Sequence, residues 1–318
     1  LPMFIMLAIS FMVQDPYGGV EWGFSTEAYV QFLFERDLDD SLILNTIYVN
    51  IVARSIGLAA MTTILCLIIG LPVAYFIARQ PEDKRNLYML LITIPFWTNL
   101  LIRTYALITV LRTEGYVNKS LGWFWEGASS LKVMVGMAPL STWEPLPLLY
   151  NNFAVILGLV YVHLPFMVLP LYAALDRLDR SLIEASLDLG AGHFRTLTQI
   201  VAPLAGPGII SGVIITFVPA LGAYLTPDLM GGPDSQMIAN VIERQFKKAN
   251  DWPFGAALSF LLMYATFAAI ALRAYFSRGV VRQARGEYDH AIADLTDAIR
   301  LDPNDAAALY YRGRAYLY

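Results

Sequence analysis

"EASLDLGAGHFRTLTQIVAP", residues 184–203, interrupts a chain that is otherwise largely apolar. Hydrophobic residues make up 57% of the 318 residues and charged residues only 15%, against roughly 45–50% and about 25% in soluble globular proteins. Apolar runs of about 20 residues recur on both sides of the stretch, and such a run can cross the hydrocarbon core of a bilayer. The composition therefore predicts a multi-span membrane protein, in which this polar stretch needs an explanation.

The stretch itself has the pattern of two short helices joined by a turn. Ser181–Glu184, "SLIE", is typical of a capping box, in which the hydroxyl caps the helix and Glu184 reaches back to the helix start. Gly190 and Gly192 predict the end of this first helix, and a second helix is expected over His193–Val201. The pattern alone is equally compatible with an ordinary amphipathic surface loop.

Six apolar runs surround this hairpin and predict six membrane spans. The first run is too short to cross a bilayer and fits either the core of a signal peptide or a span whose beginning is missing. We favour the second interpretation, because no small-residue cleavage site follows the run. A Gly-x-x-x-Gly pattern at 208–212 in the fifth run would permit a close helix approach. The runs are Leu1–Val13, Ile56–Ala78, Leu87–Leu111, Phe153–Leu175, Ala205–Pro227 and Phe254–Leu272.

Lysine and arginine are concentrated in alternate loops, and this bias predicts the orientation of the spans. Residues 79–86, residues 176–203 and the segment after the last run carry more of them than the opposite loops do. These three regions, together with the amino terminus and the carboxyl-terminal tail, are therefore expected in the cytoplasm, and residues 113–150 are expected to face outward. The outward loops hold the tryptophans expected at headgroup level, namely Trp22, Trp123, Trp125, Trp143 and Trp252.

The letters of the hairpin resemble the EAA signature of ABC importer permeases. That pattern reads Glu-Ala-Ala, three residues, Gly, nine residues, Ile, one residue, Leu-Pro. The spacing is intact here, with Ser186 in place of the second alanine and Ala202 in place of the leucine. The resemblance implies that the hairpin is a coupling helix that docks in a groove of an ATPase subunit. The residues that carry this role would be Glu184, Ala185, Gly190, Ile200 and Pro203.

Three further stretches resemble permeases of the spermidine/putrescine type. They are "IPFWTNLLIRTYA" at 94–106, "LPFMVLPLYAAL" at 164–175 and "FVPALGAYLTPDLMGGP" at 217–233. The resemblance implies one half of a heterodimer in the bacterial inner membrane, with a second permease subunit, cognate ATPase subunits and a periplasmic substrate-binding protein as partners. It also implies polyamine uptake by ATP-driven alternating access.

The chain carries no motif for ATP hydrolysis. It holds no Gly-Lys dipeptide and so cannot form a P-loop, and it lacks the His-Glu-x-x-His motif and any cluster of Cys and His typical of a metal site. We therefore expect a transport subunit and not an enzyme, with no catalytic residues, no cofactor, no metal and no nucleic-acid partner. ATP hydrolysis would then fall to a separate subunit.

Four residues are candidates for the substrate pathway: Trp97, Arg103, Tyr224 and Asp228. Arg103 lies inside an apolar run, where an arginine costs about 2.5–3.5 kcal/mol at the membrane centre and normally faces a protein interior. Its expected partner is Glu114 or Asp228. Asp228 would attract a cation at the outer mouth, or it caps a loop. His163, alone in its run, is expected to be a core residue with one hydrogen bond.

The composition changes after the last apolar run. Residues 286–318 resemble a tetratricopeptide repeat, which has a period of 34 residues. "YYRG" at 310–313 and "FSRG" at 276–279 lie 34 residues apart. If this register is real, the last span continues past Arg273 as the first helix of the repeat, and if it is chance, the chain breaks near Gly279 and the tail hangs loosely. Helices are expected over Tyr288–Leu301 and Asn304–Tyr318, with contacts from Leu295, Ala298 and Ile299 to Ala307, Tyr310, Tyr311 and Arg314.

The sequence thus predicts an all-α membrane protein of six transmembrane helices, the first of them truncated, with a cytoplasmic coupling hairpin. Residues 1–276 would form the permease domain, with a core at about 55–273, and residues 277–318 a partial repeat-like tail, either functional or a fusion artefact. Three other functions stay open. The chain could be a permease for another small solute, a membrane-anchored repeat scaffold or a membrane-embedded enzyme, although the absence of a clustered acid, base or metal set argues against the last.

Overall fold

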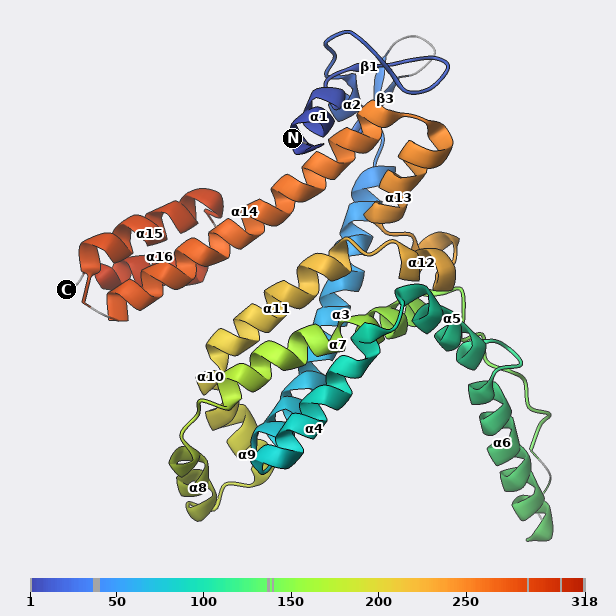
Figure 1. Cartoon of the computed structure of the whole chain (residues 1–318), viewed down its shortest axis with the longest axis vertical. Helices are drawn as coiled ribbons and strands as arrows, with labels where there is room; N and C mark the ends of the chain where they lie inside the picture. The colour runs from blue at the N-terminus through green and yellow to red at the C-terminus, as the bar shows by residue number, and fades with distance from the viewer. Residues whose placement is uncertain are drawn as a thin grey trace. The chain divides into compact units, whose positions relative to one another are not determined.

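A computed structural model describes residues 2–36, 41–135, 138, 140–284, 286–303 and 305–316. The chain is mostly helical and divides into two compact units. One unit joins residues 1–31 to residues 249–318, and the other comprises residues 32–248. Figure 1 shows the elements of each unit along the chain.

The unit of residues 32–248 begins with a two-stranded antiparallel hairpin in which Phe34 pairs with Leu44. Helices then follow one another to its end. The elements are β3 (Phe34–Arg36), β4 (Leu42–Leu44), α3 (Ile47–Ala78), α4 (Glu82–Thr93), η1 (Ile94–Trp97), α5 (Leu100–Leu111), α6 (Tyr116–Met134), α7 (Asn152–Leu175), α8 (Arg180–Asp188), α9 (His193–Thr196), η2 (Leu197–Val201), α10 (Ala202–Leu204), α11 (Gly206–Leu221), α12 (Leu225–Met230), η3 (Pro233–Ser235), α13 (Ile238–Arg244) and η4 (Gln245–Ala249).

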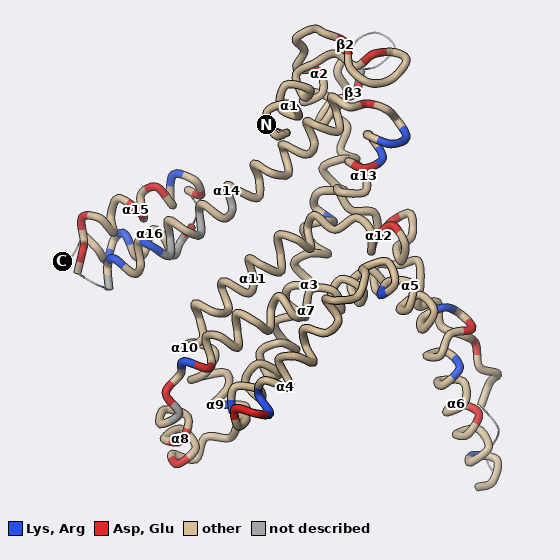
Figure 2. Tube along the Cα trace, viewed as in Figure 1, with Lys and Arg blue, Asp and Glu red and all other residues tan. Residues whose placement is uncertain are grey.

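Helices α3, α7 and α11 form the core of this unit. Two glycines of α11 let it approach α7 closely. A Cβ at Gly208 would lie 2.4 Å from the Cβ of Ala174, and one at Gly212 would lie 2.8 Å from the sulfur of Met167. The close approach predicted from the Gly-x-x-x-Gly pattern is therefore confirmed. Figure 2 shows that charged residues gather near the ends of these helices and leave their middle parts almost free of charge.

Two of the described helices, α3 and α7, are each long and apolar enough to cross a membrane. Two further candidates are bent pairs, α4–η1 with α5–α6 at 95° and α9–α10 with α11 at 79°. A single unbroken helix over Leu87–Leu111 was predicted wrongly. The chain breaks after Trp97, and Asn99 caps α5 by accepting a hydrogen bond from the backbone N–H of Leu101 at 2.8 Å. The fifth run is also divided, since α11 ends at Leu221.

The unit that contains both termini has a short amino-terminal part and a long helix. Its elements are α1 (Pro2–Ile9), β1 (Val13–Gln14), β2 (Val20–Glu21), α2 (Glu27–Val30), α14 (Trp252–Ala284), α15 (Tyr288–Leu301) and α16 (Ala306–Ala315). The first apolar run is helical only to Ile9, because Val13 already pairs in β1. Gly18 and Gly19, both with positive φ, make the turn between β1 and β2. The chain is therefore not purely α-helical, since each unit holds a short β-hairpin.

Helix α14 runs without a break from Trp252 to Ala284. Of the two alternatives that the sequence left open, the structure has the continuous helix, and the chain does not break near Gly279. Gly279 makes the packing with α15 possible, because a Cβ there would lie 2.6 Å from the Cγ of Leu295. Gly286, with φ of 78°, then turns the chain into α15.

The tail packs α15 against α14 and α16. Its buried apolar side chains are Ala291, Leu295, Ala298, Ala308 and Ala315. The face predicted for the last helix is wrong in part, since Tyr310 is 63% exposed and Arg314 is exposed as well. The small alanines of α16 face the core in their place. Asn304, Tyr318 and the side chain of Ala307, which the prediction also named, lie outside the described residues.

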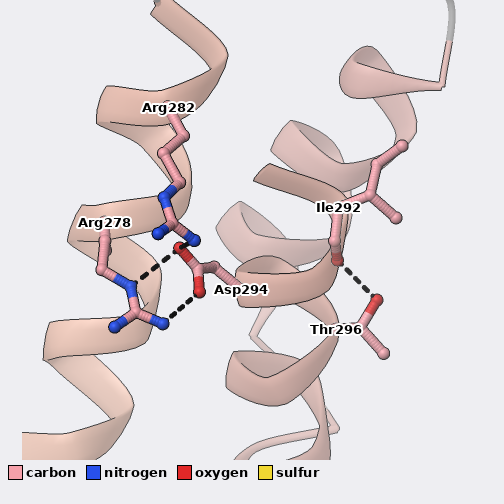
Figure 3. Close-up of polar contacts among 5 residues, drawn as sticks. All are labelled: Arg278, Arg282, Ile292, Asp294 and Thr296. Carbon is pink, nitrogen blue, oxygen red and sulfur yellow. Dashed lines mark hydrogen bonds and ion pairs between the residues drawn. The ribbon is translucent and has the colours of Figure 1, made fainter. Parts of the chain in front are cut away.

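A buried carboxylate joins α15 to α14 (Figure 3). Asp294 accepts hydrogen bonds from Nε of Arg278 at 2.9 Å and from Nη1 of Arg282 at 2.8 Å, and it forms a second contact with Nη2 of Arg278. Its side chain is 3% exposed. The hydrogen bond from Arg278 holds the pKa of Asp294 below its ordinary value of 3.8, because the guanidinium groups stabilise the ionised form. The carboxylate therefore stays charged at neutral pH inside the tail.

Candidate functional site

The polar hairpin that interrupts the apolar chain is formed by α8 and α9. Asp179 caps α8, since its Oδ1 accepts a hydrogen bond from the backbone N–H of Ser181 at 2.9 Å. That bond lowers the pKa of Asp179 by stabilising the carboxylate. The predicted capping box of Ser181 and Glu184 is therefore wrong, because the cap lies two residues earlier than expected. Glu184 is exposed and leaves the start of α8 to Asp179.

Gly190 makes the turn between the two helices, as predicted. Its φ is 83°, and a Cβ added to it would meet no atom within 4 Å. Its backbone N–H donates to the carbonyl of Leu187 at 2.9 Å, and that of Ala191 donates to Ser186 at 3.1 Å. Such bonds close the end of a helix on a left-handed residue. A larger side chain at Gly190 would thus meet strain and no steric clash.

A pair of buried hydroxyl groups ties α8 to α9. The Oγ of Ser186 and the Oγ1 of Thr196 lie 3.0 Å apart, and both side chains are buried. Ser186 stands where the EAA pattern has its second alanine. Sequence reasoning treated that serine as a neutral replacement and gave Thr196 no role. The sequence feature that could have predicted this contact is that Ser186 and Thr196 are small hydroxyl residues, one on each side of the glycine turn.

The hairpin exposes two large apolar side chains among polar ones. Leu189 is 89% exposed and Phe194 is 79% exposed, although both are large hydrophobic residues. Of the five residues predicted to couple to an ATPase, Ile200 is half-buried and the other four are exposed, namely Glu184, Ala185, Gly190 and Pro203. Exposed apolar surface rimmed by polar residues commonly marks a protein interaction site. The predicted coupling residues thus share one accessible hairpin.

The inner side of the hairpin connects to the core of its unit. Ile183 and Leu197 pack against the buried cluster that includes Val201 and Leu171. Close by, Arg85 at the start of α4 forms an ion pair with Asp176 at the end of α7, at 2.5 Å. Figure 1 shows α8 and α9 at one end of the α3–α7–α11 bundle, with α12 at the opposite end. A force on the hairpin would therefore reach the bundle through these contacts.

The predicted pathway residues lie on elements toward the α12 end of the bundle. Arg103, in α5, places its guanidinium carbon 5.9 Å from the centre of the Phe96 ring. Its Nε is buried without a hydrogen-bond partner among the described residues. The expected ion pair with Glu114 or Asp228 does not form, and a cation–π contact takes its place. An arginine in this environment has unused capacity to bind an acceptor.

An aromatic cluster surrounds this arginine. Phe96 and Phe166 meet edge to face, with their ring centres 4.8 Å apart. His163 lies 6.0 Å from the same Phe166 ring, and its Nδ1 is 2.8 Å from the carbonyl oxygen of Leu159. His163 is buried. The prediction of a core histidine with one hydrogen bond is therefore confirmed.

The other pathway candidates are accessible. Trp97 is 78% exposed, and Tyr224 and Asp228 are exposed as well. Lys247 pairs with Glu243 at 2.8 Å, and its pKa is raised first by that hydrogen bond and more weakly by the charge of Asp228. Tyr224, the N-cap of α12, and Asp228, in its first turn, thus lie at the same helix start. Among the described residues, no group of three or more His, Cys, Asp or Glu could hold a metal ion.

Comparison with known proteins adds an independent observation. The family model described as "binding-protein-dependent transport system inner membrane component" matches residues 67–282, and a TPR repeat model matches residues 273–317. The spermidine/putrescine transport system permease protein PotB of Escherichia coli (strain K12) is 38% identical over 262 residues, which cover 82% of this chain and 86% of that protein. The PotB protein of Haemophilus influenzae is 35% identical over 259 residues, covering 81% and 82%.

A solved structure supports the same fold. A chain from a bacterial ABC transporter involved in the import of the acidic polysaccharide alginate aligns with a TM-score of 0.56 and 13% identity. The alignment covers 84% of this chain and 89% of that one. At this identity the likeness concerns the fold alone.

Proposed function

The chain belongs to the family of binding-protein-dependent transport system inner membrane components, and we propose that it is the permease subunit of an ABC importer for polyamines. Its likeness to spermidine/putrescine permeases over 82% of its length carries the proposal. Such a chain is a multi-pass protein of the inner membrane and a transport component. Hydrolysis of ATP belongs to a separate ATPase subunit in this proposal.

The proposed mechanism is alternating access driven from the hairpin. ATP binding closes a pair of ATPase subunits, and the α8–α9 hairpin, seated on one of them, moves with it. The helices of this chain and of a second permease subunit then open toward a periplasmic binding protein and accept the solute. The exposed apolar side chains of Leu189 and Phe194 support this role, because they offer the ATPase a surface to cover.

The proposed topology has six spans, with the amino terminus, the hairpin and the tail in the cytoplasm. Three regions rich in lysine and arginine support it. Each bent helix pair would supply one span beside α3 and α7, from the apolar runs 87–111 and 205–227, and the apolar part of α14 and the first apolar run would complete the six. We keep residues 1–276 as the permease domain and residues 277–318 as the tail, which the proposal leaves without a part in transport.

Single-cysteine labelling tests this topology. Cys66 is buried and can be replaced by alanine to give a cysteine-free chain. Asp188→Cys should then resist an impermeant thiol reagent added to intact cells, whereas a cysteine in the exposed part of residues 113–150 should react. Labelling of Asp188→Cys from outside would overturn the proposed orientation.

Four side chains remain our proposal for the substrate pathway: Trp97, Arg103, Tyr224 and Asp228. Asp228 is the carboxylate that a cationic solute would meet, and its exposure on α12 supports this role. Asp228→Asn should therefore lower the uptake rate while the ATPase still docks. An unchanged uptake rate would indicate that Asp228 only caps a loop.

Reconstitution decides between the proposed function and its rivals. The full chain is assembled in liposomes with its cognate ATPase, second permease subunit and binding protein, and uptake of labelled spermidine and putrescine is measured with and without ATP. We expect ATP-dependent uptake of both. A complex that imports another small solute but neither polyamine would contradict the substrate, and a chain that assembles with no ATPase would favour the scaffold that the TPR match suggests.

A further inference from the structure

The segment after α6 returns along that helix and is fastened to it at several points. The side-chain amide of Asn118 donates to the backbone carbonyl of Leu146 at 3.0 Å, and its Oδ1 accepts from the backbone N–H of Leu146 at 2.9 Å. Further along, the indole N–H of Trp125 donates to the carbonyl of Ser141 at 2.8 Å. Helix α6 and residues 140–146 thus form an ordered hairpin, which we call the aromatic hairpin.

A glycine of α6 provides the seat for a second indole. A Cβ at Gly122 would lie 3.0 Å from the Cδ1 of Trp143, so the indole rests directly on the helix backbone. The ring of Trp143 lies 5.8 Å from that of Trp125, inclined by 50°. Both rings are only partly exposed. Packing and the Trp125 hydrogen bond therefore fix two aromatic faces beside each other.

Trp143 forms a wall of two open hollows in the surface, which we call the two cavities. One cavity, of about 350 Å³, is also lined by Trp123, Glu114 and Glu126. The other, of about 450 Å³, is also lined by Trp125 and Glu144. Each cavity therefore combines indole surface with at least one carboxylate.

The charge balance of the lining residues is negative in both cavities. Lys119 is the cation among the residues that line the first cavity, against two carboxylates, and the second has Glu144 without a cation. Among the described residues, no ion pair involves any of these three glutamates. Indole faces attract ammonium groups through their quadrupole, and carboxylates attract them by charge. The two cavities thus have the chemistry of a receptor for organic ammonium ions.

We propose that the aromatic hairpin captures linear polyamines, with one ammonium group in each cavity and the alkyl chain across Trp143. The shared indole wall is what favours a ligand with two charges separated by an apolar chain. This inference rests on the proposed function, which supplies the chemistry of the solute. It places a binding site outside the four pathway residues, on the segment that faces outward in the proposed topology. The headgroup position predicted for these tryptophans is the competing role.

Titration of the purified full chain in lipid nanodiscs tests the site without ATP, ATPase or binding protein. Calorimetry measures the binding of 1,4-diaminobutane and, as a single-charge control, of 1-aminobutane. We expect the diamine to bind at least several-fold more tightly than the monoamine. Glu126→Gln with Glu144→Gln should weaken diamine binding about tenfold, because each exposed ion pair contributes a factor of a few. Both side chains are exposed, so the exchange leaves folding intact.

Two matched variants sharpen the result. Asp234→Asn removes an exposed carboxylate outside both cavities and should leave binding unchanged. Trp123→Leu removes an exposed indole from the first cavity and should weaken binding about two- to fivefold. Equal diamine affinity in the unchanged chain and the double glutamine variant would overturn the proposal. Strong quenching of the hairpin tryptophans by lipids with brominated acyl chains, with no effect of the diamine, would assign them to the bilayer interface.

Failure of this site and failure of the proposed function give different results. If the reconstituted complex imports spermidine and the double glutamine variant binds the diamine normally, the capture site is wrong and the importer stands. If the complex imports no polyamine but the variant still loses diamine affinity, the cavities do bind polyamines and the imported solute is a different one.

Discussion

The α8–α9 hairpin and the α15–α16 tail are both short helical pairs, yet they differ in how far they expose their aliphatic and phenyl side chains. The hairpin leaves Leu189 89% and Phe194 79% exposed. The tail buries Leu295 and a set of alanines against α14, and its exposed leucines, Leu301 and Leu309, are 48% and 40% exposed beside the exposed tyrosines Tyr310 and Tyr316. The hairpin therefore carries the more fully exposed apolar side chains, which leave surface for a partner to cover.

The polar contacts inside the two helical pairs also differ, since they are neutral in the hairpin and charged in the tail. The hairpin is tied by two neutral hydroxyl groups, Ser186 and Thr196, and such a bond contributes about 1 kcal/mol. The tail is tied by the carboxylate of Asp294 and the two guanidinium groups of Arg278 and Arg282. A lightly fastened hairpin could adjust to the moving ATPase subunit that we propose as its partner. The charged clamp instead fixes α15 on the extension of α14.

The largest expected effect comes from removing the clamp. Arg278→Met with Arg282→Met leaves the carboxylate of Asp294 without its partners, which should destabilise the packing of α15 on α14. Hydrogen exchange of the α15 amides in the full chain should accelerate about a hundredfold, and Arg300→Met, an exposed arginine of the same helix, serves as the control. Polyamine uptake should stay unchanged. Loss of uptake with normal insertion would show that the tail takes part in transport.

A smaller effect is expected at the turn of the hairpin. Gly190→Leu forces a side chain into the left-handed region at a cost of about 1–2 kcal/mol, with no steric clash to add to it. Uptake should fall several-fold while the chain still inserts in the membrane. Gly190→Asn is the matched control, because asparagine tolerates this conformation. Normal uptake by Gly190→Leu would mean that the hairpin is not the coupling element.

The smallest expected effect distinguishes the residue that caps α8 from a residue on its exposed surface. Asp179→Ala should destabilise α8 by about 1 kcal/mol through loss of the N-cap, and hydrogen exchange of its first turn reports this change. Glu184→Ala should leave exchange unaltered, since Glu184 is exposed and does not cap the helix. A fall in uptake by Glu184→Ala would then reflect a lost contact with the ATPase. Faster exchange in Glu184→Ala would restore the capping box.

The sequence predicted features that depend on local chemistry. A glycine with positive φ at 190 follows from residue type and spacing, and the 34-residue spacing raised the continuous last helix as one of two alternatives. The cap was missed because Asp179 and Ser181 both suit a helix start, and only geometry chooses between them. The break after Trp97 was missed because a largely apolar run contains a Pro and an Asn that mark the end of one helix and the start of another.

Long-range pairs were harder to predict from the sequence. Nothing near Asp294 in the chain signals that its carboxylate would meet two arginines of another helix. Arg103 was assigned a carboxylate partner because charge favours one, but an aromatic ring lies closer. The aromatic hairpin depends on a backbone that returns along α6, which periodicity does not reveal.

Cross-linking between the hairpin and the ATPase tests the central claim most directly. In a Cys66→Ala background, Leu189→Cys carries a photoactivatable thiol reagent in the assembled transporter, and Leu146→Cys, exposed on the aromatic hairpin, is the control. We predict that Leu189→Cys cross-links to the ATPase subunit and that Leu146→Cys does not. A transport-active complex in which Leu189→Cys fails to reach the ATPase would contradict the account.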